Sequence, residues 1–335
     1  MNEARKALRL LLISDTHGKL DIINDLADQV QADGVIHAGD FGFYDDGSYE
    51  RLSNRELSLQ VIHSDLPKAD KDALLALPPS DRIKAVKEAL PLSEFPDYVA
   101  GRKRFRFPVY AVWGNHEDID VVDRLFRGEL QVENLHLLHH RRACLVGSAL
   151  VYGLGGNFLV GSKLLQRPLA GGSGRIWSTL SQYADLVETL KNEQEVPGPS
   201  IFVSHVSPGK EPFVEFVGAR TRADVTVSGH MGAPTCMVWN AFAIRSVEEA
   251  ERHLQDGFDD VRKTCLEDPR SATAEVERSL NLLSQLPEER IYLGRKTRAP
   301  RWYRDMTHVN LPDAHCGYAV IDIADGRMKI QAFRT

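Results

Sequence analysis

The stretch LRLLLISDTHGKLDIINDLADQVQADGVIHAGD, residues 8–40, decides the fold class of this chain. The apolar run 8–14 has the length of a buried strand, and a second apolar run covers 34–38. Between these runs, residues 19–31 carry apolar side chains at helical spacing, namely Leu20, Ile23, Leu26, Ala27 and Val30. Strand, helix and strand in this order predict a βαβ unit, in which a right-handed crossover joins two parallel strands.

Further strands of the same kind follow along the chain. Residues 107–113, 201–203 and 225–227 are apolar at nearly every position, as is typical of parallel strands covered on both faces. Residues 179–190 have helical periodicity, and the chain closes with two strand patterns around Asp325 and Gly326, which predict a β-hairpin. The core is therefore predicted to be layered α/β.

Two helix-prone segments interrupt this rhythm. Residues 43–106 are polar and punctuated by prolines, while 246–304 open with a capping box, Ser246 to Glu249, and continue as charged amphipathic helix. We expect a single domain over 1–335 that carries helical insertions at 43–106 and 246–304. The first insertion leaves the chain directly after Asp40 and returns before Asn115, so we expect it to lie near the functional site.

The bulk composition narrows the class of protein. The chain has 335 residues, 43% of them hydrophobic, and its net charge of −6 gives no overall attraction to nucleic acid or anionic lipid. The four cysteines form no CxxC pair, so a disulfide framework is not expected and a reducing, cytoplasmic location fits best. The uncharged stretch 143–161 is broken by glycines, and we expect no membrane span there.

Residues of metal-ligand type follow five of the predicted strands. In chain order they are Asp15 and His17, Asp40, Asn115 and His116, His205, and His230. The carboxyl ends of parallel strands meet at one edge of a sheet, so these side chains are expected to converge. Two divalent ions about 3.5 to 4 Å apart require an anionic bridging ligand, neutral side chains that complete each shell, and room for water. Aspartate, histidine and asparagine together supply such a set.

The series SDTHG (14–18), AGD (38–40), GNHE (114–117), SH (204–205) and GH (229–230) resembles the calcineurin-like metallophosphoesterase superfamily in order, strand context and spacing. The resemblance implies a four-layer α/β/β/α sandwich, to which the sequence adds the two helical insertions. It further implies that Asp15 and His17 hold the first metal, that Asp40 bridges both metals, and that Asn115, His205 and His230 complete the second. His116 is expected to stay off the metals, to be oriented by a neighbouring carboxylate, and to act as a general acid or phosphate contact.

One position departs from the family pattern. Many members place another first-metal histidine where this chain has Gly232. The resemblance therefore implies a first metal that is held by fewer protein ligands and is weaker or wetter, but present. His308 and His315, near the final hairpin, are alternative sources of the missing ligand.

The expected function is hydrolysis of a phosphomonoester or phosphodiester by a metal-bound hydroxide. The mixed ligand set accepts manganese, iron, zinc or magnesium, and the substrate is a phosphoprotein, a nucleotide or a nucleic acid. One alternative is a non-catalytic protein-binding module on a degenerate site. Another is a nuclease acting on single-stranded or branched nucleic acid, because 114–156 has some similarity to lariat debranching enzymes and the basic run 294–304 includes Trp302 and Tyr303. The sequence does not give the oligomeric state.

Overall fold

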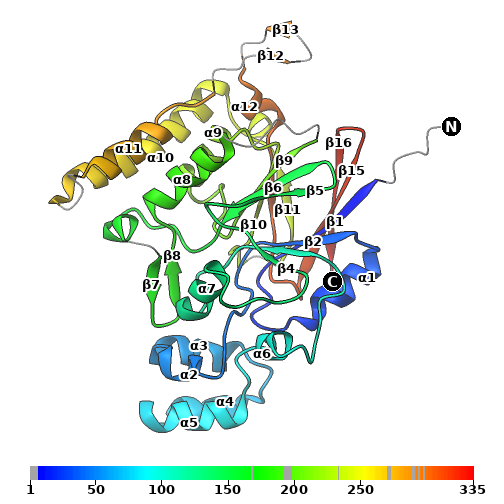
Figure 1. The fold of residues 1–335 in the computed structure, drawn as a ribbon, viewed down its shortest axis with the longest axis vertical. Coiled ribbons are helices and arrows are strands. Elements are labelled where there is room, and N and C mark those ends of the chain that lie inside the picture. Colours follow the sequence, from blue (N-terminus) through cyan, green and yellow to red (C-terminus); the bar gives the residue numbers. More distant parts are fainter. Residues whose placement is uncertain are drawn as a thin grey trace.

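The computed structural model describes residues 7–166, 169–191, 198–232, 234–269, 273–287, 291–292, 295–296 and 299–335. Two six-stranded sheets pack face to face, and helices flank both of them (Figure 1). This is the predicted α/β/β/α sandwich. Residues 294, 297 and 298 of the basic run 294–304 lie outside the described residues.

The first sheet contains the predicted βαβ unit. Its strands, in spatial order, are β16 (Arg327–Arg334), β15 (Gly317–Ala324), β1 (Leu8–Ile13), β2 (Gly34–His37), β3 (Val109–Ala111) and β4 (Leu135–Leu137). Strands β1 to β4 run parallel, with Leu12 paired to Ile36 and Ile36 paired to Tyr110. The predicted terminal hairpin, β15 and β16, adds two antiparallel strands beside β1.

The second sheet collects the later strands. Their spatial order is β11 (Met237–Trp239), β14 (Thr307–Asn310), β10 (Val225–Ser228), β9 (Ser200–Ser204), β6 (Ala149–Leu154) and β5 (Ala143–Val146). The four central strands, β14, β10, β9 and β6, are parallel, so their carboxyl ends share one edge. Two further ladders are small: β7 (Ala170–Gly172) with β8 (Arg175–Trp177), and β12 (Ile291–Tyr292) with β13 (Arg295–Lys296).

Strand alternation divides the core into two parts. Leu10 and Leu12 of β1 point between the sheets, where they meet residues such as Val203 and Val227. Leu11 and Ile13 point the other way, into the core beneath the helices. Both faces of β1 are fully buried from Leu10 to Ile13, which accounts for the apolar sequence of that part of the strand.

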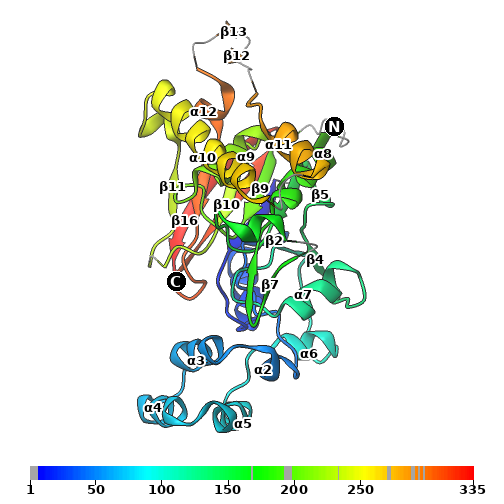
Figure 2. The same ribbon diagram turned by 90° about the vertical axis from the view of Figure 1, so that its left-hand side faces the viewer.

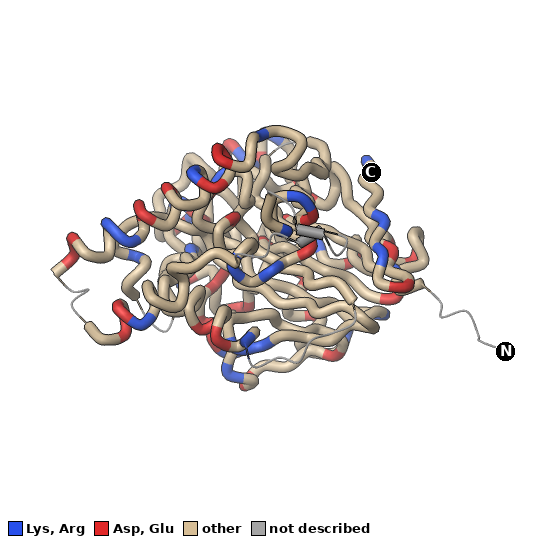
Figure 3. Tube along the Cα trace, turned by 90° about the horizontal axis from the view of Figure 1, so that it is seen from above, with Lys and Arg blue, Asp and Glu red and all other residues tan. Residues whose placement is uncertain are grey.

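Helices cover the outer faces of both sheets. They are α1 (Asp21–Val30), α7 (Ile119–Phe126), α8 (Leu180–Lys191), α9 (Pro212–Arg220), α10 (Val247–Glu267), α11 (Ala274–Leu283) and α12 (Arg301–Asp305), with short 3-10 turns at Ser162–Leu165 and Ala241–Ala243. Ser246 caps the start of α10 as predicted, because its side chain accepts a hydrogen bond from the Glu249 backbone N–H. Charges of both signs are interspersed along the outer helices (Figure 3).

The segment 43–106 forms a helical unit below the sheets in Figures 1 and 2. It contains α2 (Ser48–Arg51), α3 (Asn54–His63), α4 (Lys68–Ala76), α5 (Pro79–Ala89) and α6 (Phe95–Val99). Tyr44, Leu57, Val61 and Val86 belong to a hydrophobic cluster of its own, separate from the two core clusters of the sandwich. Among the described residues, no helix has both the length and the apolar character needed to cross a lipid bilayer.

Candidate metal centre

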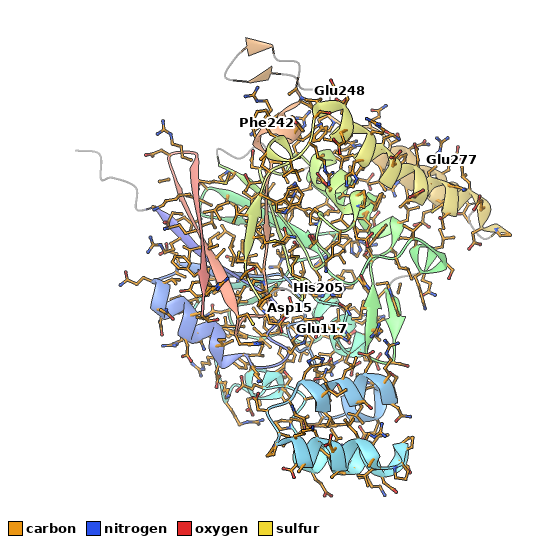
Figure 4. The ribbon with its side chains drawn as sticks, turned by 180° about the vertical axis from the view of Figure 1, so that it is seen from behind. Asp15, Glu117, His205, Phe242, Glu248 and Glu277 are labelled. Atoms are coloured by element: carbon orange, nitrogen blue, oxygen red, sulfur yellow. The ribbon has the colours of Figure 1, made fainter. Side chains whose placement is uncertain are left out.

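The predicted ligand residues meet where the two sheets present the carboxyl ends of their parallel strands. Asp15 follows β1, Asp40 follows β2, His205 follows β9 and His230 follows β10. Figure 4 shows Asp15, His205 and Glu117 close together between the sheets and the 43–106 helices, while Phe242, Glu248 and Glu277 lie at the far end. Convergence at the sheet edge is the geometry expected of an open α/β fold.

Four of these residues have strained backbones. Asp15, His17, Asp40 and His230 all lie in the left-handed region, with φ between 47° and 54°. Non-glycine residues adopt this conformation rarely, and such strain gathers at functional sites because the surrounding structure enforces it. Here the enforcement comes from the neighbouring loop, since Asp15 N–H donates to Gly39 O (2.9 Å) and His17 N–H donates to Asp40 O (2.9 Å).

Two motif glycines allow the loops to approach each other. A Cβ atom on Gly114 would lie 1.9 Å from Asp40 Oδ1, and one on Gly229 would lie 2.5 Å from Asp15 Oδ2. Neither carboxylate could keep its place beside a larger residue. The glycines of GNHE and GH therefore make room for ligands that come from other motifs.

One group of ligand atoms surrounds Asp40. Asp40, His205 and His230 each offer an atom within 4.8 Å of the others. His205 donates its Nδ1–H to the carbonyl of Ala38 (2.8 Å), which leaves Nε2 of the neutral ring as an acceptor. That nitrogen lies 2.9 Å from Asn115 Oδ1 and 3.6 Å from Asp40 Oδ1. Three hydrogen-bond acceptors therefore lie close together, and this arrangement fits a bound cation.

The electrostatics also favour a cation. Burial opposes charge on Asp40, but His205, His17 and His116 together hold its pKa below the usual value. Burial and the nearby His205 lower the pKa of His230 to about 4, so its ring is neutral near pH 7 and able to act as a ligand. Burial raises the pKa of Asp15.

A second group of ligand atoms lies around Asp15. Asp15, His17 and Asp313 each offer an atom within 4.8 Å of the others. The sequence did not single out Asp313, which follows β14 as the other candidate ligands follow their strands. Neither histidine considered as a replacement belongs to this group. His308 is fully buried, bonded to Thr226 and stacked on Trp239, while His315 is exposed.

His116 lies beside these groups. Its backbone N–H donates to Asp40 Oδ1 (2.8 Å), and its Nδ1 lies 2.6 Å from Glu56 Oε2. Arg175 holds the other oxygen of Glu56 at 2.5 Å. Burial works against charge on His116, but the bond to Glu56 and the charge of Asp40 outweigh it and raise the pKa of the imidazole. Glu56 belongs to α3, so the segment 43–106 supplies the carboxylate that holds His116.

Glu117 ties the Asp40 and Asn115 loops together. Its two oxygens accept four backbone N–H groups, those of Phe41 (2.7 Å), Gly42 (3.1 Å), Phe43 (2.6 Å) and Gly114 (3.2 Å). Burial and the charge of Asp40 raise the pKa of Glu117 to about 8, against the effect of these donors. A cation beside Asp40 would offset that charge and favour the carboxylate that the four donors match.

Comparison with known proteins matches the same region. The sequence profile of the calcineurin-like phosphoesterase family covers residues 8–234, which is most of the chain and includes every predicted ligand. The chain belongs to this family. Calcineurin-like phosphoesterases are generally metal-dependent hydrolases of phosphate esters, and both ligand groups fit the divalent ions that they typically bind.

Two solved structures align with almost the whole length of this chain. One crystal structure covers 98% of this chain and 99% of its own at 11% identity, with a TM-score of 0.48. A metallophosphoesterase from Sphaerobacter thermophilus covers 98% of this chain and 89% of its own at 10% identity, with a TM-score of 0.29. No curated protein sequence matches the chain.

Proposed function

We propose that this chain hydrolyses a phosphate ester with the help of two divalent metal ions. The observation that carries the proposal is a cluster of acceptor atoms on mostly buried side chains. Among the described residues, no Lys or Arg ion pair is found for Asp15 or Asp40, whose nearest charged partners are histidines. Two buried carboxylates without a cationic partner are costly unless ions are bound there.

The ligands divide between the two ions. The second ion would be held by Asp40, Asn115, His205 and His230. Asp40 would also bind the first ion, together with Asp15 and His17. When bound, such ions neutralise phosphate oxygens and lower the pKa of a water ligand. The protein itself contributes by placing the ligands on loops that are held together by hydrogen bonds, those accepted by Glu117 and those donated by the backbone N–H groups of Asp15 and His17.

His116 is the proposed general acid. Glu56 engages its Nδ1, so Nε2 is the nitrogen that faces a leaving oxygen. A positioned acid of this kind contributes about 10²- to 10⁴-fold to the rate. Glu56 is a positioning residue in this scheme, because it acts only through His116.

The segment 43–106 is the proposed selector of the substrate. A groove beside His17 runs along this segment. Its walls include Lys19, Gln60, His63, Leu66, Leu90 and Leu92. Lys19 and His63 offer polar contacts and the leucines offer apolar surface, so the groove suits the organic part of an ester rather than phosphate alone.

The proposed location of the enzyme is the cytoplasm. The four cysteines form no CxxC pair, and the net charge of −6 gives no overall attraction to anionic lipid. Manganese is among the metals that the mixed ligand set accepts.

The test combines metal content with hydrolysis. The purified protein should turn over p-nitrophenyl phosphate or its bis-ester when Mn²⁺ is added, and elemental analysis should find bound metal. His116→Asn should keep the metal and lose most of the activity, which separates this enzyme from a contaminating phosphatase. If neither ester is hydrolysed and no metal is bound, the enzyme proposal is wrong and the protein-binding alternative gains support. A panel of phosphoprotein, nucleotide and single-stranded nucleic acid then identifies the substrate class.

A further inference from the structure

The starting point is the incomplete ligand set of the proposed first ion. Asp15, His17 and the shared Asp40 give three protein ligands, and Gly232 has no side chain to add. A Cβ atom on Gly232 would meet no atom within 4 Å, so nothing else in the described part of the chain fills that space. Any further protein ligand must reach the ion from a different element.

Asp313 comes from such an element. It follows β14, which pairs in parallel with β10, the strand that leads to His230. The loop is held in place, because Leu311 N–H donates to Ser228 O (2.7 Å) and the backbone N–H of Cys316 donates to Asp313 O (2.8 Å). Asp313 thus occupies the same structural position, the carboxyl end of a parallel strand, as every ligand predicted from the family motifs.

The charges at this point are unbalanced without a cation. Carboxylate oxygens of Asp15 and Asp313 lie within 4.8 Å of each other. Among the described residues, Asp313 makes no ion pair with a lysine or arginine, and the ion-pair partner of Asp15 within 4.0 Å is His17. Two carboxylates at this separation repel each other unless a proton or a cation lies between them. The third member of the group is His17, and histidine is a residue type that binds metal ions through its neutral ring.

We propose that Asp313 is the fourth protein ligand of the first metal ion and replaces the histidine that the family places at the position of Gly232. The assignment rests on the two-metal function proposed above. It changes the chemistry of the first ion, whose ligands become three carboxylates and one imidazole. Oxygen-rich sets of this kind suit Mn²⁺ or Mg²⁺, whereas the second set, with two imidazoles, also suits Zn²⁺.

Calorimetric titration of the metal-free protein with Mn²⁺ tests the assignment, with electron paramagnetic resonance as a direct count of bound ions. Wild-type protein should bind two ions. Asp313→Ala should retain the second ion and bind the first at least about tenfold more weakly, since even the loss of an outer contact costs a metal site that much. The near-isosteric Asp313→Asn should weaken the same ion, and circular dichroism shows whether either variant is folded.

Two further variants sharpen the comparison. His315→Ala changes an exposed residue of the same loop and should leave both affinities unchanged. Gly232→His in the Asp313→Ala background should restore the first ion, because the site has space and histidine already adopts a similar φ at His17 and His230. The restored site should also gain affinity for Zn²⁺ relative to Mn²⁺.

Different failures lead to different conclusions. If wild-type protein binds two ions and folded Asp313→Ala and Asp313→Asn bind both with unchanged affinity, the assignment of Asp313 is overturned and the proposed function stands. If His315→Ala loses the first ion instead, His315 is the ligand. If wild-type protein binds no ion, the two-metal function and the assignment fall together.

Discussion

The substitution Glu117→Gln probes the link between the stability of the fold and the metal centre. Each carboxylate oxygen of Glu117 accepts two backbone N–H groups: Oε1 those of Phe41 and Gly114, and Oε2 those of Gly42 and Phe43. Glutamine keeps the shape of the side chain but replaces one oxygen with an NH₂ donor. Two buried backbone N–H groups would then face a donor and lose their acceptor.

The cost follows from the number of unpaired groups. A buried polar group that loses its partner costs about 1–3 kcal/mol, so in the Mn²⁺-bound protein, where the cation favours the Glu117 carboxylate, two of them lower the free energy of unfolding by about 2–6 kcal/mol. The lost bonds belong to residues next to Asp40 and Asn115. We therefore expect weaker binding of the second ion as well as lower stability.

Urea unfolding followed by circular dichroism measures the first effect, and Mn²⁺ titration measures the second. Glu133→Gln is a matched control, because Glu133 is 68% exposed and the same change there should shift stability by less than about 0.5 kcal/mol. If Glu117→Gln is as stable as the control and binds Mn²⁺ as tightly as wild type, the four-donor account of the loops is refuted.

Three further predictions concern the ligands, the close approach of the loops and the pH dependence of stability. Asp40→Ala should abolish hydrolysis and lower the metal content measured by elemental analysis; near wild-type activity would contradict the proposed bridge. Gly114→Ala should do the same because its Cβ would lie 1.9 Å from Asp40 Oδ1, whereas Gly161→Ala, with no atom within 4 Å, should be neutral. Burial raises the pKa of Glu215 to about 7, so the folded state binds the carboxyl proton of Glu215 more tightly than the unfolded chain does. The contribution of this proton to the free energy of unfolding therefore decreases by about 3 kcal/mol as pH rises from about 4.5 to 7. The charged or titratable groups that face Glu215 are Arg245, His253 and His308. Thermal unfolding at pH 5 and pH 8 should show this loss of stability in wild-type protein and not in Glu215→Gln. The same change in stability in both proteins would refute the prediction.

Sequence patterns predicted a layered α/β core with six candidate ligand residues and His116 at one edge, and the family resemblance implied the sandwich. The reason is that an apolar strand followed by a polar residue is a local signal, and parallel strands present their carboxyl ends together. The structure places those residues as expected, and their roles as ligands remain proposals. The family resemblance also implied that a carboxylate would orient His116, but it did not identify Glu56.

Glu56 and Asp313 mark the limit of sequence reasoning. Glu56 lies in the first turn of α3, where a glutamate is ordinary, and only the docking of that helix brings it to His116 and Arg175. Asp313 sits in a short loop beyond residue 304, outside the part of the chain that carries the family motifs.

The sequence by itself determined the strands, the order of the motifs and the residues that end each strand, because these depend on local patterns of apolar and polar side chains. Only the tertiary structure decided which carboxylates face which histidines. That outcome depends on how distant segments pack. In this chain the family motif has Gly232, which offers no side-chain ligand atom, at this site, and only the packing of the loop after β14 brings Asp313 beside Asp15 and His17.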